Sequence, residues 1–183
     1  MDSQQEMHTG TAFYKETTLV TKKILITIVA FALACALATA QDPKEKTELV
    51  KDFTLTADMD GLILNFVVLN NKTVDAIFSG TSKYAIRARA NASTVFFVQC
   101  VPDKDIDFHP EFRVEQNGFY IDAKTQSIKN FKEGPVAKGT RMEGLVQLSR
   151  KIDLAKPFKI VNTENDAAAE FQVSEETLNL LKN

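Results

Sequence analysis

One apolar segment decides which residues of this chain can fold together. It runs uncharged for seventeen residues, from Ile24 to Ala40, and it follows two basic residues, Lys22 and Lys23. A secretory signal has a basic start, an apolar core of about 7 to 15 residues and small residues before the cleavage site. The triplet Ala-Thr-Ala at residues 38–40 provides such a site. We therefore predict cleavage before Gln41 and a periplasmic or secreted mature chain.

The alternative for this segment is an uncleaved helix that anchors the domain to a membrane, because seventeen residues approach the roughly 20 that span a bilayer. Residues 1–19 do not fit a signal, since they are polar and net acidic where a signal prefers positive charge. We interpret them as an over-extended gene model, with translation starting at Val20. The predicted organisation is a polar leader at 1–19, a signal peptide at 20–40, a linker at 41–52 and a folded domain at 53–183.

Composition limits the kinds of domain and partner that follow. The 143 residues from Gln41 onward are the size of one domain with its own core. The chain has a formal net charge of −2 and no block of basic residues, which argues against a nucleic-acid surface. Cys100 is the only cysteine left after cleavage, so the mature chain cannot form an internal disulfide. Its apolar surroundings, Val95 to Val101, favour a buried thiol over a reactive one.

Short apolar runs separated by turn residues predict a β-rich domain. We expect strands at residues 53–57, 62–69, 84–90, 95–101, 112–115, 119–121, 145–148, 158–161 and 170–173, where β-branched and aromatic residues are common or alternate with polar ones. The pair Asn117-Gly118 between two runs predicts a hairpin, because both residues tolerate a positive φ. Residues 74–78 fit either a strand or a single helical turn.

The series of strands without alternating helices indicates a sandwich rather than a parallel sheet. The only helix that the pattern predicts firmly is terminal, with Ser174 as its cap and Leu178 and Leu181 as its apolar stripe. The pattern is similar to the immunoglobulin-like modules of exported bacterial proteins, although the Cys-Trp-Cys signature of true immunoglobulin domains is missing. The predicted fold class is mostly β: an immunoglobulin-like antiparallel β-sandwich with a short C-terminal α-helix, preceded by an N-terminal signal helix. The predicted core residues are Leu64, Phe66, Ile86, Phe96, Val98, Val114, Tyr120, Val146, Leu148, Phe158 and Phe171.

An acidic segment is the candidate for metal chemistry. Asp103, Asp105 and Asp107 alternate ahead of His109, so an extended chain would present three carboxylates on one face. Oxygen clusters of this kind suit Ca²⁺, but the spacing fails as an EF-hand because the turn glycine is missing. His109 and Cys100 are too few nitrogen and sulfur donors for a structural zinc site. We expect a solvated edge that binds no metal, and we predict no cofactor.

A long basic segment is the candidate for partner binding. Residues 122–142 read as one loop, and its cations are Lys124, Lys129, Lys132, Lys138 and Arg141. Long loops in compact domains tend to be functional or disordered, and the apolar residues Ile128 and Phe131 favour order. An ordered basic loop would receive an anionic partner surface or a polyanionic envelope glycan. The competing interpretation is a solvated loop whose lysines only maintain solubility.

No nucleophile elbow, Walker loop, dinucleotide fingerprint or H-E-x-x-H motif occurs in the sequence. We therefore predict a non-enzymatic exported module that binds or scaffolds an envelope or extracellular partner. That partner would be a protein or an anionic envelope component, and a membrane is involved only if the signal helix stays uncleaved. The alternative function is a metal-dependent hydrolase, or a protein that binds Ca²⁺ or Zn²⁺, using the segment from Asp103 to His109.

Overall fold

The computed structural model describes residues 43–182, so the predicted leader and signal peptide lie outside the described residues. The helices are α1 (Pro43–Asp52), α2 (Asn71–Ile77), α3 (Ser82–Ala92) and α4 (Glu175–Lys182). The strands are β1 (Thr54–Met59), β2 (Leu62–Val68), β3 (Val95–Cys100), β4 (Ile106–Phe108), β5 (Phe112–Gln116), β6 (Phe119–Lys129), β7 (Gly134–Val136), β8 (Met142–Leu148), β9 (Phe158–Asn162) and β10 (Ala168–Phe171). The described part is therefore mostly β and ends in a short helix, as predicted.

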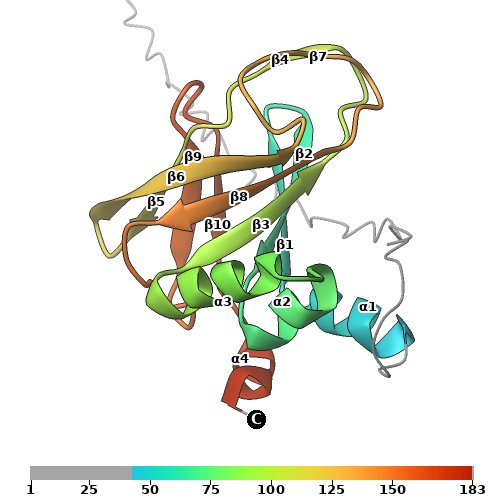
Figure 1. Ribbon diagram of the computed structural model, residues 1–183. Helices are drawn as coiled ribbons and strands as arrows, with labels where there is room; N and C mark the ends of the chain where they lie inside the picture. Colours follow the sequence, from blue (N-terminus) through green and yellow to red (C-terminus); the bar gives the residue numbers. More distant parts are fainter. Residues whose placement is uncertain (1–42, 183) are drawn as a thin grey trace, which may run out of the picture. The chain divides into compact units, whose positions relative to one another are not determined.

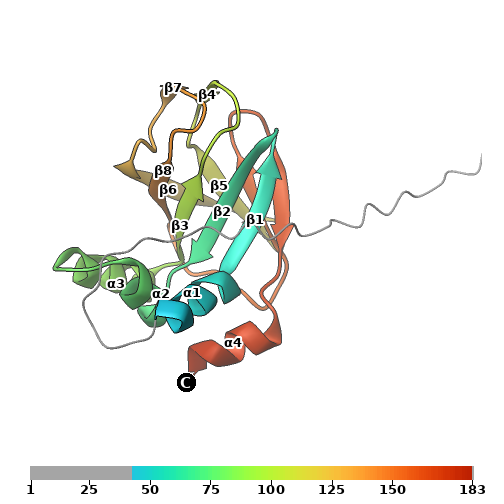
Figure 2. The same cartoon turned by 90° about the vertical axis from the view of Figure 1, so that its right-hand side faces the viewer.

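Eight strands form one antiparallel sheet in the order β1-β2-β3-β8-β6-β5-β9-β10, while β4 and β7 form a separate ribbon (Figure 1). Strand β6 joins the two halves of the sheet, because Phe119–Asp122 pairs with β5 and Ala123–Lys129 pairs with β8. Strands β1 and β10, at the ends of this order, come within 8 Å of each other between Cα atoms (Figure 2). The sheet is thus nearly closed, and the two separate sheets of an immunoglobulin-like sandwich are not seen in residues 43–182.

Phenylalanine rings fill the interior of the sheet. Phe66 lies edge-on to Phe96 and Phe112, with ring centroids 6.1 and 5.7 Å apart, and Phe96 stacks on Phe158 at 6.3 Å. Large aromatic side chains bury much apolar surface, and edge-on pairs add attraction beyond that burial. Most of the predicted core is confirmed as buried: Leu64, Phe66, Ile86, Phe96, Val98, Val114, Val146, Leu148 and Phe158, with Phe171 partly buried against the same cluster.

Tyr120 is the exception in that core prediction, because it is 63% exposed. Asn117 and Gly118 form the predicted hairpin turn, with φ of 53° and 76°, as a type I′ turn requires. The resulting register places Tyr120 opposite Glu115 on the outer face, and the next residue, Ile121, is buried instead. A shift of one residue exchanges the inner and outer faces of a strand.

Residues 84–90 belong to helix α3 and not to the predicted strand. The residues of this helix that are at least half-buried are Lys83, Ile86, Arg87, Arg89 and Ala90, and all of them except Arg89 recur at helical spacing. Alanine and arginine, which fill much of the segment, are strong helix formers. Together with α2, this helix covers the outer side of β3, where Phe97 is buried.

The predicted linker and the ambiguous segment are helical as well. Helix α1 spans most of the linker, and its residues Leu49 and Val50 pack against the core. Helix α2 begins with a capping box: the Asn70 side chain accepts hydrogen bonds from the N–H groups of Lys72 and Thr73, and the Thr73 hydroxyl accepts one from the Asn70 N–H. The helices gather at one end of the sheet, and the β4–β7 ribbon lies at the other (Figures 1 and 2).

The C-terminal helix is attached through side chains that the sequence did not indicate. Lys72 Nζ donates a hydrogen bond to the Leu180 carbonyl at 2.8 Å, and Leu180 is partly buried against the core. Leu178 of the predicted stripe is half-buried, and the Leu181 side chain lies outside the described residues. Among the described residues, the members of the core cluster lie between Leu49 and Leu180. No helix within residues 43–182 has the length and apolar character to cross a bilayer.

Candidate functional site

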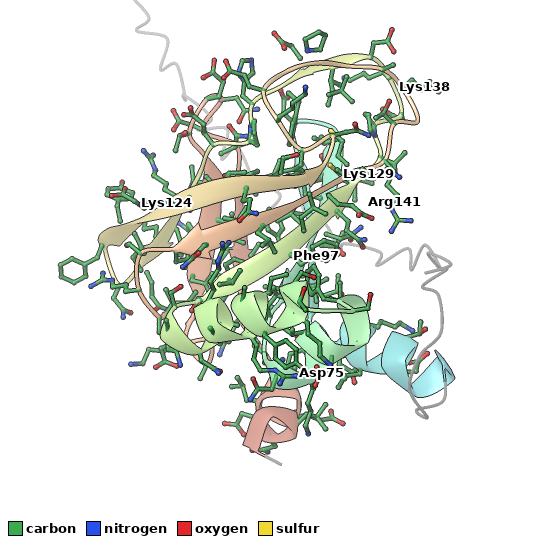
Figure 3. All side chains as sticks on the ribbon, viewed as in Figure 1. Asp75, Phe97, Lys124, Lys129, Lys138 and Arg141 are labelled. Atoms are coloured by element: carbon green, nitrogen blue, oxygen red, sulfur yellow. The ribbon has the colours of Figure 1, made fainter. Side chains whose placement is uncertain are left out.

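The five cations of the predicted basic loop do not come together. Residues 122–129 are part of strand β6, so the connection to β8 is only 130–141 and not the predicted 122–142. Lys124 and Lys129 lie on β6, whereas Lys138 lies in the connection, well away from Lys124 (Figure 3). Of the two expected anchors, Phe131 is buried and Ile128 is 44% exposed. The loop prediction is therefore wrong at residues 122–129, which belong to the polar strand β6, at 134–136, which form β7, and at Met142, which begins β8.

The remaining connection is ordered, but acidic groups balance its cations. The Phe131 ring packs edge-on against Phe108 at 5.0 Å and ties the connection to the core. The Lys138 N–H donates to Asp105 Oδ1 at 2.8 Å. Arg141 Nε donates to Glu143 Oε1 at 2.5 Å. The Lys132 and Lys138 side chains are exposed, whereas Arg141 is paired with Glu143, so the cations of this connection do not act as one basic surface.

The acidic segment helps to hold the β4–β7 ribbon. Asp105 accepts the backbone hydrogen bond just described, and Phe108 turns inward and is buried. His109 lies between two carboxylates, with Nε2 3.6 Å from Asp107 Oδ2 and Nδ1 3.7 Å from Glu133 Oε1. Within residues 43–182, no three His, Cys, Asp or Glu side chains are placed to hold a metal ion together.

Lys124 instead takes part in a groove between α3 and the outer side of β6 and β8. The hollow has a volume of about 370 Å³. We call it the donor groove, and its lining residues are Arg89, Lys124, Thr125, Gln126, Leu145 and Gln147.

The strand register and one helix position these side chains. On the sheet, Lys124 lies opposite Gln147 and Gln126 lies opposite Leu145, so the four side chains form one block of the outer face. Leu145 is buried and forms an apolar floor. Arg89, in the last turn of α3, reaches across the groove, and its Nη1 donates to Gln126 Oε1 at 2.5 Å.

The polar groups that remain for a ligand are mostly hydrogen-bond donors. Because the Gln126 oxygen accepts from Arg89, the Gln126 amide presents its NH₂ group, beside the remaining guanidinium N–H groups of Arg89 and the ammonium of Lys124. No carboxylate among the described residues forms an ion pair with Arg89 or Lys124. Donors that carry positive charge fit carboxylate, sulfate or phosphate groups.

Sequence reasoning found one cation of this groove and missed the other. Lys124 was among the predicted partner-binding residues, whereas Arg89 was assigned to the polar face of a strand. Its helical setting was indicated by the alanine-rich composition of residues 85–92, which favours a helix over a strand. The pairing of Lys124 with Gln147 depends on the strand order, which the sequence does not show.

Comparison with known proteins gives no functional assignment, so any assignment must rest on the geometry of the structure. The chain matches no protein-family model, and no curated protein or solved structure matches it.

Proposed function

We propose that the protein is an exported, non-enzymatic binding module that holds an anionic group of an envelope or extracellular partner in the donor groove. The observation that carries the proposal is the convergence of Arg89, Lys124 and the Gln126 amide over the apolar floor of Leu145. The proposal of export rests on the apolar segment from Ile24 to Ala40 and its Ala-Thr-Ala site.

The geometry favours binding of an anion over simple solvation of the cations. Arg89 is already held by Gln126, so less side-chain freedom is lost when a ligand binds. A hydrogen bond between a charged donor and an anion contributes about 1.5 to 3 kcal/mol. Because the groove is open to solvent, added salt should weaken the attraction, with screening over roughly 8 to 10 Å at physiological ionic strength.

The first experiment identifies the partner and then tests variants that lack the donor side chains of the groove. The protein beginning at Gln41 is used to capture partners from an envelope extract, and the captured partner is then titrated against variants. Replacing Arg89 and Lys124 together by alanine should weaken binding by tenfold or more, because two charged donors are lost. Gln126→Glu should also weaken binding, since its carboxylate would occupy the donors and repel an anion.

The matched control removes the same amount of charge elsewhere. Lys132 and Lys138 are exposed cations outside the groove, and replacing both by alanine should leave affinity close to that of the wild type. Equal losses in both double variants would show that only net charge matters. Unchanged binding in the Arg89 and Lys124 double variant would rule out the groove as the site.

A further inference from the structure

The first two residues of β6, directly after the Asn117-Gly118 turn, are the two most exposed aromatic side chains among the described residues. Phe119 is 65% exposed and Tyr120 is 63% exposed, and as consecutive strand residues they present their rings on opposite faces of β6. The positive φ angles of Asn117 and Gly118 fix the turn and with it the position of both rings. Arg113 lies over the Tyr120 ring, 4.8 Å from its centroid. The rings are thus presented on a well-defined turn.

Two cations from a distant part of the chain lie beside the Phe119 ring. Arg150 and Lys151, in the connection from β8 to β9, line a hollow of about 250 Å³ together with Phe119 and Ile121. Both cations are exposed, and no carboxylate among residues 43–182 forms an ion pair with either. We call Phe119, Tyr120, Arg150 and Lys151 the aromatic tip, and it shares no residue with the donor groove.

Buried polar contacts hold the two parts of the aromatic tip together. The Gln116 side chain, which is mostly buried, donates to the Asp153 carbonyl at 2.8 Å and accepts from the Asp153 N–H at 3.0 Å. The Thr94 hydroxyl accepts from the Ile152 N–H at 3.1 Å. The Gln116 bonds join the end of β5 to the segment that follows Arg150 and Lys151, and the Thr94 bond ties the same segment to the start of β3, so the spacing between Phe119 and the two cations is restrained.

We propose that the aromatic tip docks on an anionic lipid bilayer, with Phe119 and Tyr120 entering the interfacial region and Arg150 and Lys151 facing the headgroups. Tyrosine favours the membrane–water interface because its ring is apolar and its hydroxyl is polar, and the phenylalanine ring adds apolar surface. Basic residues near an anionic leaflet add electrostatic attraction. The net charge of the chain is −2, so attraction to an anionic surface must come from a local cluster such as this one.

The test uses the protein beginning at Gln41, because the core residues that the structure describes lie within 49–180 and the apolar segment would itself bind lipid. The chain contains no tryptophan, so Phe119→Trp provides a single fluorescent reporter. Its emission should shift to the blue with vesicles of phosphatidylglycerol and phosphatidylcholine, and should not shift with phosphatidylcholine alone. Ile63→Trp is the matched control: Ile63 is 56% exposed on β2, which β3 and β8 separate from β6, and its emission should stay unchanged.

Co-sedimentation with the same anionic vesicles measures the contribution of each side chain. Partitioning should fall by about fivefold for each cation removed when Arg150 and Lys151 are replaced by alanine. It should also fall in Phe119→Ala, whereas alanine at Lys132 and Lys138 should have little effect at the same net charge. Arg89→Ala should leave partitioning unchanged, which separates this proposal from the donor groove.

Three results would overturn the proposal. The first is no binding of the protein to phosphatidylglycerol vesicles at low salt. The second is binding that the aromatic-tip variants do not weaken. The third is binding to a soluble polyanion such as polyphosphate, through the same cations, without any binding to vesicles.

Discussion

At the scale of single residues, the contact between Gly144 and Phe131 closes one end of the core. An added Cβ at Gly144 would lie 2.2 Å from Phe131 Cδ1, and the ring is buried, so it has no free space to enter. We expect Gly144→Ala to lower the free energy of unfolding by about 1 to 3 kcal/mol. Urea denaturation followed by far-UV circular dichroism measures this change.

A second background tests whether that steric contact is the cause. In Phe131→Leu the smaller side chain leaves room for a methyl group, so Gly144→Ala should cost clearly less there than in the wild type. An equal cost in both backgrounds would place the effect in the backbone of β8 and not in the ring.

Cys100 links the stability of the fold to alkaline pH. Burial raises the pKa of its thiol from 9.0 to about 12. Between these values the unfolded chain releases the proton while the folded chain keeps it, so stability falls as pH rises from 9 to 12, by at most about 1.4 kcal/mol per pH unit. Cys100→Ala should show a smaller decline over the same range in urea denaturation. Identical profiles for the two proteins would contradict this assignment.

Burial at single positions was predictable wherever a run is apolar on both faces. Phe96 and Val98 lie in such a run and are buried, because any register would bury them. The exposure of Tyr120 was not predictable in this way, because the face of the sheet on which its side chain lies depends on the register that the Asn117-Gly118 turn imposes. The same register exposes Phe119, so the aromatic tip depends on the turn and not on composition.

At the scale of elements, the N-terminus of α2 depends on Asn70. Its side-chain oxygen accepts from two N–H groups that have no partner inside the helix, those of Lys72 and Thr73. We expect Asn70→Ala to lower the free energy of unfolding by about 0.5 to 2 kcal/mol. Asn70→Asp keeps the acceptor and is the control that should retain most of the stability. A loss in Asn70→Asp as large as in Asn70→Ala would contradict a capping role.

Element types were predictable where period and propensity agree, and not where they conflict. In α3 the apolar residues alternate by chance, and the alternation favoured a strand over the helix that alanine and arginine prefer. The second half of β6 shows the opposite case. Its residues from Gln126 onward are all exposed, so no alternation marks them as a strand. Arg89 and Lys124, which lie on these two elements, could therefore not be brought together from sequence.

At the scale of the whole molecule, the β-rich character was predictable but the arrangement of the strands was not. A sandwich and a nearly closed sheet both need short strands, turns and an apolar interior. The structure differs from a sandwich because β6 is long enough to pair with β5 through its first residues and with β8 through the rest. The length of a single polar strand therefore decides between two architectures.

The approach of β1 and β10 also bears on how this chain behaves among copies of itself. Exposed sheet edges recruit strands from neighbouring chains and start aggregation. A foreign strand inserted between two others needs about 4.8 Å on each side, and β1 and β10 come within 8 Å between Cα atoms. Strands β1 and β10 thus obstruct each other's free edges. The backbone groups of both strands are shielded from pairing with another chain, although the sheet does not close completely.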